Sequence, residues 1–202
     1  MNRMPRPVIL ASASTSRARL LRSAGVPFSQ VAAAVDEAAV KAALHAEGAT
    51  AADCAETLAE MKAVKVSQGQ PDALVIGADQ LLDCRGAWFD KPQDMAAARR
   101  HLTALSGTTH TLATSVVVAQ GGARIWHHAE QPALTMRTLS EAFIAHYLDA
   151  VGDAVLSSVG AYHLEGRGAQ LFTRIDGDYF AILGLPLIPL LAFLREHGIL
   201  PT

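Results

Sequence analysis

The first residues that could do chemistry form a hydroxyl-rich segment, Ser12-Ala13-Ser14-Thr15-Ser16-Arg17, between a strand-like run over 7–11 and a helical pattern over 17–24. Such a turn could bind an anion, because the first N–H groups of a helix lack intrahelical partners and the helix dipole is positive there. A second apolar run, over 74–78, leads to Asp79. A carboxylate in that place must be solvated, paired or metal-bound. An anion pocket near a carboxylate predicts chemistry on phosphates.

Five charged residues extend this interpretation: Arg17, Glu37, Lys62, Asp79 and Lys91. Each has an ordinary explanation when taken alone, such as a helix cap for Glu37 or a solvated helix face for Lys62. Together, the three basic residues would neutralise a triphosphate, and the two acidic residues offer oxygen ligands for a Mg²⁺ that bridges phosphate oxygens. Asp79 could instead deprotonate an attacking water. The sequence leaves both roles of Asp79 open.

The hydrophobic patterns and cap residues predict the elements that position these side chains. We expect helices over 17–24, 38–47, 53–68, 94–105, 141–151 and 187–196, strands over 28–35, 74–78, 109–119 and 123–136, and a hairpin over 81–89. A loop over 152–158 is expected to precede short strands through Ile182. Helices and strands interleave, but the hairpins require antiparallel pairing, so we predict an α/β fold with a mixed sheet. No linker interrupts the pattern, which favours a single domain over 1–202.

Composition excludes several classes of protein. Half of the 202 residues are apolar and the net charge is -2, so we expect no nucleic-acid polymer as partner. The apolar runs are far shorter than the roughly 20 residues that span a bilayer, so no membrane partner is expected. Cys54 and Cys84 have no metal-binding spacing, which favours a reduced, cytoplasmic protein.

Taken in order, nine short motifs resemble those of the Maf nucleotide pyrophosphatases, over nearly the whole chain. They are Leu10-Ala11-Ser12-Ala13-Ser14-Thr15-Ser16-Arg17 with Leu20-Leu21, Asp36-Glu37, Leu58 to Ala63 with its helix lysine, Ile76-Gly77-Ala78-Asp79-Gln80, Lys91-Pro92, Leu105-Ser106-Gly107 with His110, Gly160-Ala161-Tyr162, Glu165-Gly166 and Gly184-Leu185-Pro186-Leu187. Each motif is weak alone, but their order is specific.

The resemblance implies hydrolysis of a nucleoside triphosphate to the monophosphate and pyrophosphate, with Mg²⁺ or Mn²⁺. It also implies an elongated mixed sheet flanked by helices, of the Maf/ITPase type, with two lobes and a central cleft. Asp79 takes the catalytic acidic position, where it is usually described as a proton acceptor. We expect phosphate binding by Ser14, Arg17, Lys62 and Lys91, and metal binding by Glu37 and Asp79.

The base-selecting positions of the family correspond to Ser16, Gln80 and Glu165. An ionised Glu165 has only acceptors, which suit the adjacent N1 and N2 donors of guanine. Gln80 with Glu165 also resembles the branch that acts on 7-methyl-GTP. That branch has a tryptophan at the position of Ser16, where an aromatic ring would favour a cationic base. A lysine found in many members is also replaced here, by Ser158, and we expect either a lower affinity for the triphosphate or a different arrangement of phosphate contacts.

The leading hypothesis is therefore a metal-dependent, house-cleaning enzyme that clears modified or noncanonical triphosphates with a guanine-type base. The alternative is a nucleotide-binding regulator of cell division with little or no hydrolytic activity. A generic phosphatase, which would release orthophosphate first, is a third hypothesis. The sequence leaves a homodimer open.

Overall fold

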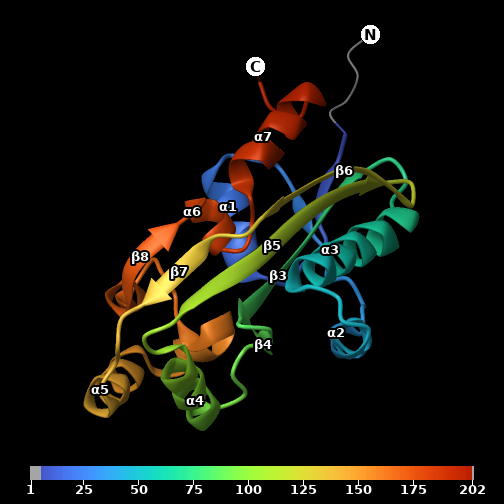
Figure 1. Ribbon diagram of the computed structural model, residues 1–202. Helices are drawn as coiled ribbons and strands as arrows, with labels where there is room; N and C mark the ends of the chain where they lie inside the picture. Colours follow the sequence, from blue (N-terminus) through green and yellow to red (C-terminus); the bar gives the residue numbers. More distant parts are fainter. Residues whose placement is uncertain (1–5, 202) are drawn as a thin grey trace. The chain divides into compact units, whose positions relative to one another are not determined.

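The structure, a computed structural model, describes residues 6–201, so both ends of the expected domain over 1–202 lie outside the described residues. The chain, drawn in Figure 1, divides into two compact units by its contacts. Unit 1 comprises the chain up to Gln80, Thr114–Glu130 and the chain from Asp178. Unit 2 comprises Leu81–Ala113 and Gln131–Gly177. The single domain and the central cleft between lobes stay predictions.

The strands of unit 1 form a mixed sheet, as predicted. Strand β1 (Val8–Leu10) pairs in parallel with β2 (Ser29–Gln30) and with β3 (Leu74–Cys84). Strand β5 (Thr109–Gln120) follows β3 in the sheet and pairs antiparallel with β6 (Ala123–Glu130). The mixed α/β prediction is confirmed by these pairings.

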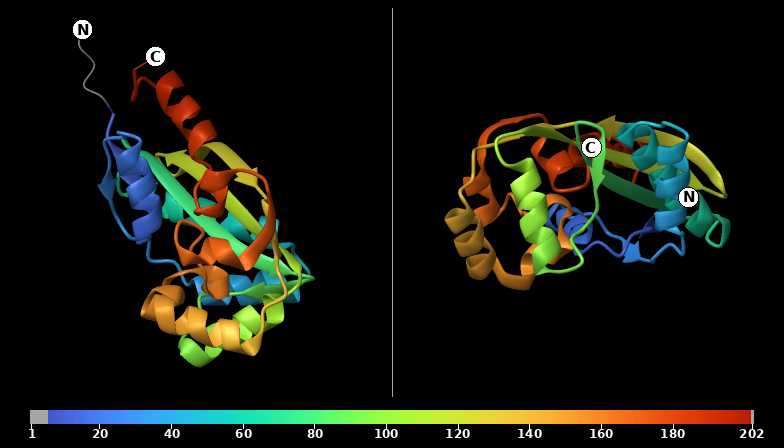
Figure 2. Two further views of the ribbon diagram at one scale, coloured as in Figure 1. Left: turned by 90° about the vertical axis from the view of Figure 1, so that its left-hand side faces the viewer. Right: turned by 60° about the horizontal axis from the view of Figure 1, so that its bottom comes forward.

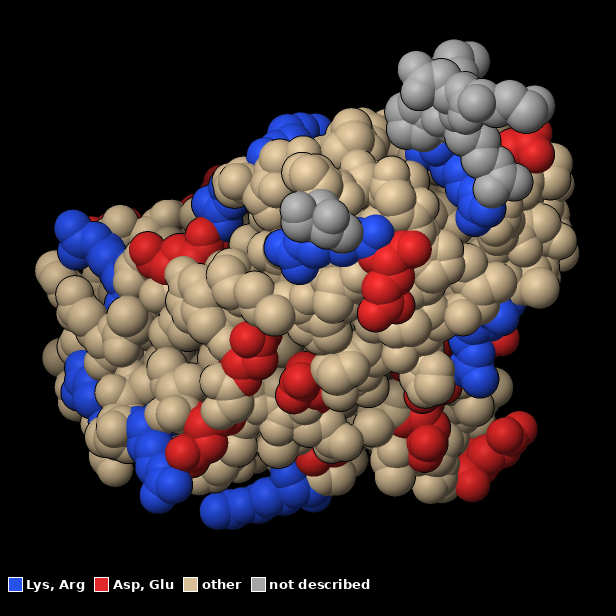
Figure 3. All heavy atoms as spheres, turned by 90° about the horizontal axis from the view of Figure 1, so that it is seen from above, with Lys and Arg blue, Asp and Glu red and all other residues tan. Residues whose placement is uncertain are grey.

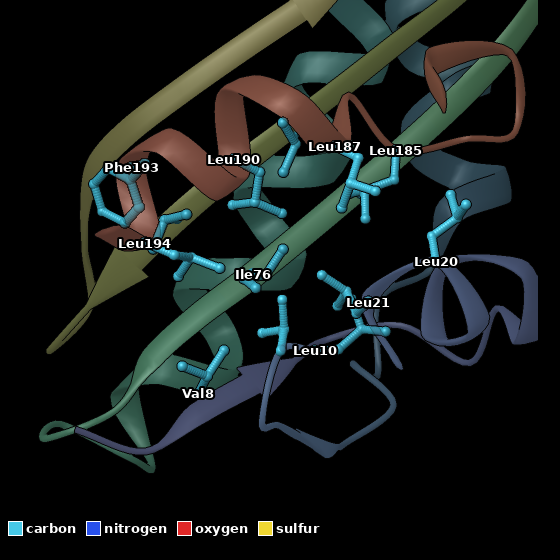
Figure 4. Packing of buried hydrophobic residues seen from close by; sticks show 14 of the residues in the cluster. Val8, Leu10, Leu20, Leu21, Ile76, Leu185, Leu187, Leu190, Phe193 and Leu194 are labelled. Carbon is cyan, nitrogen blue, oxygen red and sulfur yellow. The ribbon is translucent and has the colours of Figure 1, made fainter. Parts of the chain in front are cut away.

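One face of the unit 1 sheet packs against helices α1 (Thr15–Ser23) and α7 (Leu187–Glu196). Side chains alternate between the two faces of a strand, so Ile76 and Ala78 of β3 both point into this core. Figure 4 shows the strand and helix side chains meeting there: Val8, Leu10, Leu20, Leu21, Ile76, Leu185, Leu187, Leu190, Phe193 and Leu194. This apolar cluster fixes α1 against the sheet and thereby places the hydroxyl-rich turn.

Helix α3 (Ala51–Gln68) covers the opposite face of the unit 1 sheet (Figures 1 and 2). It begins with a capping box in which Thr50 and Asp53 exchange side-chain and backbone hydrogen bonds. Gly77 allows the close approach, because a Cβ atom there would lie 2.1 Å from the Ala59 carbonyl oxygen. Helix α2 (Glu37–Ala46), capped by Asp36, packs beside α3. The first residue of α2 and the middle of α3 are therefore neighbours.

Unit 2 contains the far halves of β3 and β5 and the elements around them. Strand β4 (Ala87–Phe89) pairs with β3, and β7 (Ala133–Met136) pairs with β5 and with β8 (Phe172–Asp176). Helix α4 (Met95–Leu105) packs against α5 (Glu141–Val151) and two 3₁₀ helices, η1 (Gly152–Ser157) and η2 (Val159–Ala161). A third 3₁₀ helix, η3 (Arg167–Leu171), precedes β8. The turn at Gly152, with a φ of 63°, separates α5 from η1.

Four predicted elements need correction. The expected strand over 28–35 is reduced to Ser29–Gln30. The β stretch over 123–136 is interrupted at 131–132, where Pro132 has no N–H to donate to a ladder. The expected loop over 152–158 is mostly the 3₁₀ helix η1. The short strands expected through Ile182 are replaced by η2 and η3, by the single strand β8 and by helix α6 (Tyr179–Ile182), which Asp178 caps.

Strand β3 is also longer than expected. The apolar run predicted a strand that ends before Asp79, whereas β3 continues through Asp79 to Cys84. Its neighbour β1 ends at Leu10, which pairs with Ile76. Asp79 therefore lies in the middle of its own strand but just beyond the end of β1, where a polar side chain can be accommodated.

The surface carries both signs of charge. On the face shown in Figure 3, Lys and Arg lie among Asp and Glu, consistent with 17 basic and 19 acidic residues. Among the helices within residues 6–201, none has both the length and the apolar character needed to cross a membrane.

Two of the sequence motifs meet in the interior of unit 2. His110 Nε2 lies 2.7 Å from the Tyr162 hydroxyl, and both rings contact Phe172. Burial lowers the pKa of His110 from 6.5 to about 4 and raises the pKa of Tyr162. Both side chains are therefore uncharged at neutral pH, and their contact stabilises the packing of unit 2.

The low pKa of His110 predicts acid sensitivity. In the unfolded chain His110 binds a proton as the pH falls below about 6.5, whereas the folded protein resists protonation down to about 4. Folding stability is therefore lost as the pH falls through this window, by about 2 kcal/mol between about pH 7 and pH 5. His110→Gln should flatten this part of the pH dependence, measured by urea unfolding. His146→Gln, a change on the exposed side of α5, should keep the wild-type slope; an unchanged slope in His110→Gln would refute the assignment.

Candidate active site

The hydroxyl-rich turn forms the N-terminus of helix α1. Ser14 is the N-cap residue, and its hydroxyl accepts a hydrogen bond from the Arg17 backbone N–H. Ser12 Oγ accepts from the Ser14 backbone N–H at 3.2 Å, and Gln30 donates to the Ser12 carbonyl oxygen at 2.7 Å. The turn is thus held by its own hydroxyls, and the helix begins two residues earlier than the pattern predicted.

Arg17 is buried and its guanidinium is fixed at two points. Its Nε donates to the Gly184 carbonyl oxygen at 2.7 Å, and its Nη1 donates to Ser12 Oγ at 3.2 Å. Gly184 has a φ of 97°, and a Cβ atom there would lie 3.6 Å from Arg17 Nε. The loop before α7 therefore holds the arginine against the turn at the start of α1.

Lys62 of α3 lies between two carboxylates. Its Nζ is 2.5 Å from Asp79 Oδ1 and 2.8 Å from Glu37 Oε1. The Lys62 and Asp79 side chains are each 7 % exposed, whereas that of Glu37 is 44 % exposed. The buried ammonium and the buried carboxylate require each other, because an isolated charge in such a position is very costly. Glu37 is the most exposed of the three side chains and lies on the solvent side of the group.

Arg17 belongs to the same electrostatic group. Burial lowers the pKa of its guanidinium from the ordinary value, while the negative charges of Asp79 and Glu37 act in the opposite direction. Arg17, Lys62, Asp79 and Glu37 thus contribute two positive and two negative charges to one place in unit 1. The group is neutral overall, and its members come from α1, α3, β3 and α2.

Gln80 follows Asp79 and points to the other face of β3. Its Nε2 donates to Thr114 Oγ1 at 2.8 Å and to the carbonyl oxygens of Ala181 and Ile182 at 2.9 and 3.2 Å. Because a carbonyl oxygen can only accept, these partners fix the orientation of the Gln80 amide. The Gln80 side-chain oxygen faces Gly184, because a Cβ atom added to that glycine would lie 3.8 Å from it.

The structure brings together most of the side chains that the sequence singled out. Ser14, Arg17, Glu37, Lys62, Asp79 and Gln80 all lie in unit 1, and Ser16 is half-buried in the first turn of α1. Lys91 and Glu165 belong to unit 2. Lys91 is exposed between β4 and α4, and Glu165 is exposed in the turn before η3. The roles assigned to these two residues stay predictions.

Three residues of the site have no individual role in the sequence-based predictions: Ser12, Thr114 and Gly184. Each acts on a predicted residue, since Ser12 and Gly184 hold Arg17 and Thr114 holds Gln80. Ser12 and Gly184 stand in the first and last motifs of the family pattern, which was the available signal. The contact between Arg17 and Gly184 joins residues 167 positions apart, and no local pattern encodes it.

Both predicted metal ligands are oxygen donors that already share one cation. Glu37 and Asp79 each contact the Lys62 ammonium, so a position between them favours positive charge. Carboxylate oxygens are the ligands that Mg²⁺ and Mn²⁺ prefer. Within residues 6–201, no group of three or more His, Cys, Asp or Glu side chains is arranged to bind a metal by itself. The two carboxylates are oxygen donors of the kind that a divalent cation takes, and metal binding by Glu37 and Asp79 stays a prediction.

Comparisons with known proteins agree with the family that the motifs indicate. The profile of the Maf-like protein family matches residues 7–197. A nucleoside triphosphate pyrophosphatase of Granulibacter bethesdensis is 55 % identical over 190 residues, which cover 94 % of this chain and 96 % of that protein. One of Paramagnetospirillum magneticum is 56 % identical over 94 % of this chain and 98 % of its own. A 7-methyl-GTP pyrophosphatase of Brucella abortus is 53 % identical over 94 % of this chain and 96 % of its own.

Proposed function

The chain belongs to the Maf family, and on that premise we propose that it hydrolyses a nucleoside triphosphate to the nucleoside monophosphate and pyrophosphate. The observation that carries the proposal is the group of charges beside the N-terminus of α1, formed by the buried Arg17, Lys62 and Asp79 with the more exposed Glu37. A triphosphate and a divalent cation bring the charges that such a group can bind.

Phosphate binding is assigned to the turn and to the basic side chains. The N-terminus of α1 and the Ser14 hydroxyl suit one phosphate group, and Arg17 is held rigidly beside them. Lys62 would exchange a carboxylate partner for a phosphate oxygen, and Lys91 of unit 2 would bind the tail as well. Glu37 and Asp79 would hold Mg²⁺ or Mn²⁺, which when bound would neutralise charge on the phosphates.

The chemical step is the addition of water to a phosphorus atom of the α–β anhydride. A new P–O bond forms, the bridging P–O bond breaks, and pyrophosphate leaves with the bridging oxygen. In the alternative to metal binding by Asp79, this carboxylate would accept the proton of the attacking water through Oδ1, the oxygen that faces Lys62, once Lys62 has turned to a phosphate oxygen. Lys62 and Arg17 stabilise the charge that spreads over the phosphate oxygens.

A guanine-type base suits the residues assigned to base selection. The Gln80 amide is oriented so that its carbonyl oxygen is left to accept a hydrogen bond, and an ionised Glu165 also only accepts. The Watson–Crick edge of guanine offers adjacent N–H donors, and 7-methyl-GTP carries the same edge. Ser16 adds a small polar group in place of the tryptophan of that branch. Relatives named 7-methyl-GTP pyrophosphatase support this assignment.

A cytoplasmic location and a nucleotide, rather than a nucleic-acid polymer, as partner remain part of the proposal. Neither Cys54 nor Cys84 forms a disulfide, as a reducing compartment would favour. Whether the protein forms a homodimer is left open.

The first test measures product release from a panel of triphosphates that includes GTP, 7-methyl-GTP, ATP and UTP, with Mg²⁺ or Mn²⁺. We expect release of pyrophosphate, fastest with a guanine-type base. Asp79→Asn keeps the shape of the side chain but removes its charge, and should lower kcat by about 10² to 10⁴-fold, the usual contribution of a general base. Thr103→Ala on the exposed side of α4 is the control and should keep wild-type turnover.

The outcomes separate the hypotheses. Orthophosphate as first product would indicate the generic phosphatase. Calorimetric binding of GTP without turnover of any substrate would indicate the nucleotide-binding regulator. Full activity in Asp79→Asn would refute the assignment of the proton acceptor, and equal turnover with and without added cation after chelation would refute the metal requirement.

The role of Glu165 has its own test. Glu165→Gln replaces one acceptor with a donor, so it should lower kcat/KM for GTP and 7-methyl-GTP by about tenfold, as expected for one mispaired base edge. Turnover of UTP should change little. Gln170→Glu, an exposed change in η3, controls for altered surface charge. Equal losses with every base would show that Glu165 is structural and that it does not select the base.

A further inference from the structure

Two buried polar atoms of unit 1 have no hydrogen-bond partner among the described residues: Asp79 Oδ2 and Ser115 Oγ. Asp79 is 5 % exposed and Ser115 is 1 % exposed. Buried polar atoms normally have a partner, because burying one without a hydrogen bond costs free energy. One of these atoms is a carboxylate oxygen, which accepts, and the other is a hydroxyl, which can donate.

The strands place these two side chains on the same face of the sheet. Strands β3 and β5 are neighbours, and they run in opposite directions (Figure 1). Gln80 of β3 bonds to Thr114 of β5, so these two residues lie opposite or diagonal to each other on one face. Asp79 precedes Gln80 and Ser115 follows Thr114, so both turn to the other face and are cross-strand neighbours there.

Helix α3 covers that face. Ala59 and Ala63 of α3 pack on Val117 of β5, and the same two alanines approach Gly77 of β3. Asp79 comes two residues after Gly77 on β3, and Ser115 comes two residues before Val117 on β5. Each of the two therefore points to the same side of its strand as that neighbour. The two atoms therefore share the space under α3, next to the position from which Lys62 reaches Asp79.

We propose that Ser115 is a positioning residue for Asp79, and that its hydroxyl donates a hydrogen bond to Oδ2. Rotation about the single side-chain dihedral of serine moves Oγ among three staggered positions, which gives the hydroxyl its reach. With Oδ2 anchored on the inner side, Oδ1 is directed to Lys62 and to the position of the attacking water. The inference rests on the proposed role of Asp79 in the hydrolysis, and Ser115 itself touches neither water nor nucleotide.

The main test compares Ser115→Ala and Ser115→Thr in pyrophosphate release. Loss of one hydrogen bond to a charged group predicts a kcat lower by about tenfold or more in Ser115→Ala, with KM unchanged within about twofold. Ser115→Thr keeps the hydroxyl and should recover most of kcat. Val117→Ala, which removes buried methyl groups from the same face of β5, should lower thermal stability and keep kcat. A wild-type kcat in Ser115→Ala, or a loss in Ser115→Thr as large as in Ser115→Ala while both remain folded, would overturn the inference.

A second measurement does not depend on activity. The shift in melting temperature caused by Ser115→Ala should be largest in the wild type and should nearly vanish in an Asp79→Leu background, since the acceptor is then gone. Equal shifts in melting temperature in both backgrounds would show that Ser115 does not donate a hydrogen bond to Asp79. A wild type that releases no pyrophosphate would refute the proposed function alone, because this stability comparison would still decide the contact between Ser115 and Asp79.

Discussion

The site depends on the burial of one ammonium group against one carboxylate. Lys62 and Asp79 are both nearly inaccessible to solvent, so the Asp79 carboxylate depends on the Lys62 ammonium, which also contacts Glu37. Their contact requires α3 to lie very close to β3, and Gly77 permits this because it has no side chain at the point of closest approach. A single small residue in a strand thus determines where a lysine of a helix can reach.

The remaining charges complete a neutral group around this pair. Glu37 enters at the start of α2, and Arg17 enters from α1, where Ser12 and the Gly184 carbonyl hold it. The two basic side chains of this group are compensated by its two acidic ones. The rigid hydrogen bonds around Arg17 reduce the ordering that binding requires.

Local patterns predicted much of this arrangement. The bounds of α5 and α7 match the predicted ranges, since Ser140 caps one and Pro186 precedes the other. The ordered motifs point to Arg17, Lys62 and Asp79, which the fold brings into one group of charges. In the segment 159–182 only β8 confirms the predicted short strands, and the 3₁₀ helices there have no periodic signal that would have indicated them. Contacts made by Gly184, Thr114 and Ser115 depend on tertiary packing between distant parts of the chain, which neither propensity nor spacing encodes.

The unfolding free energies of Lys62→Met, Asp79→Asn and the double variant, measured by urea denaturation, test this dependence most directly. Lys62→Met leaves the Asp79 carboxylate buried without its cation and should cost about 3 kcal/mol or more. Asp79→Asn should cost less, because Lys62 keeps Glu37 as a partner. The account predicts that the double variant is more stable than Lys62→Met alone, since the second change removes the unpaired charge. A double variant that loses the full sum of the two single changes would contradict it.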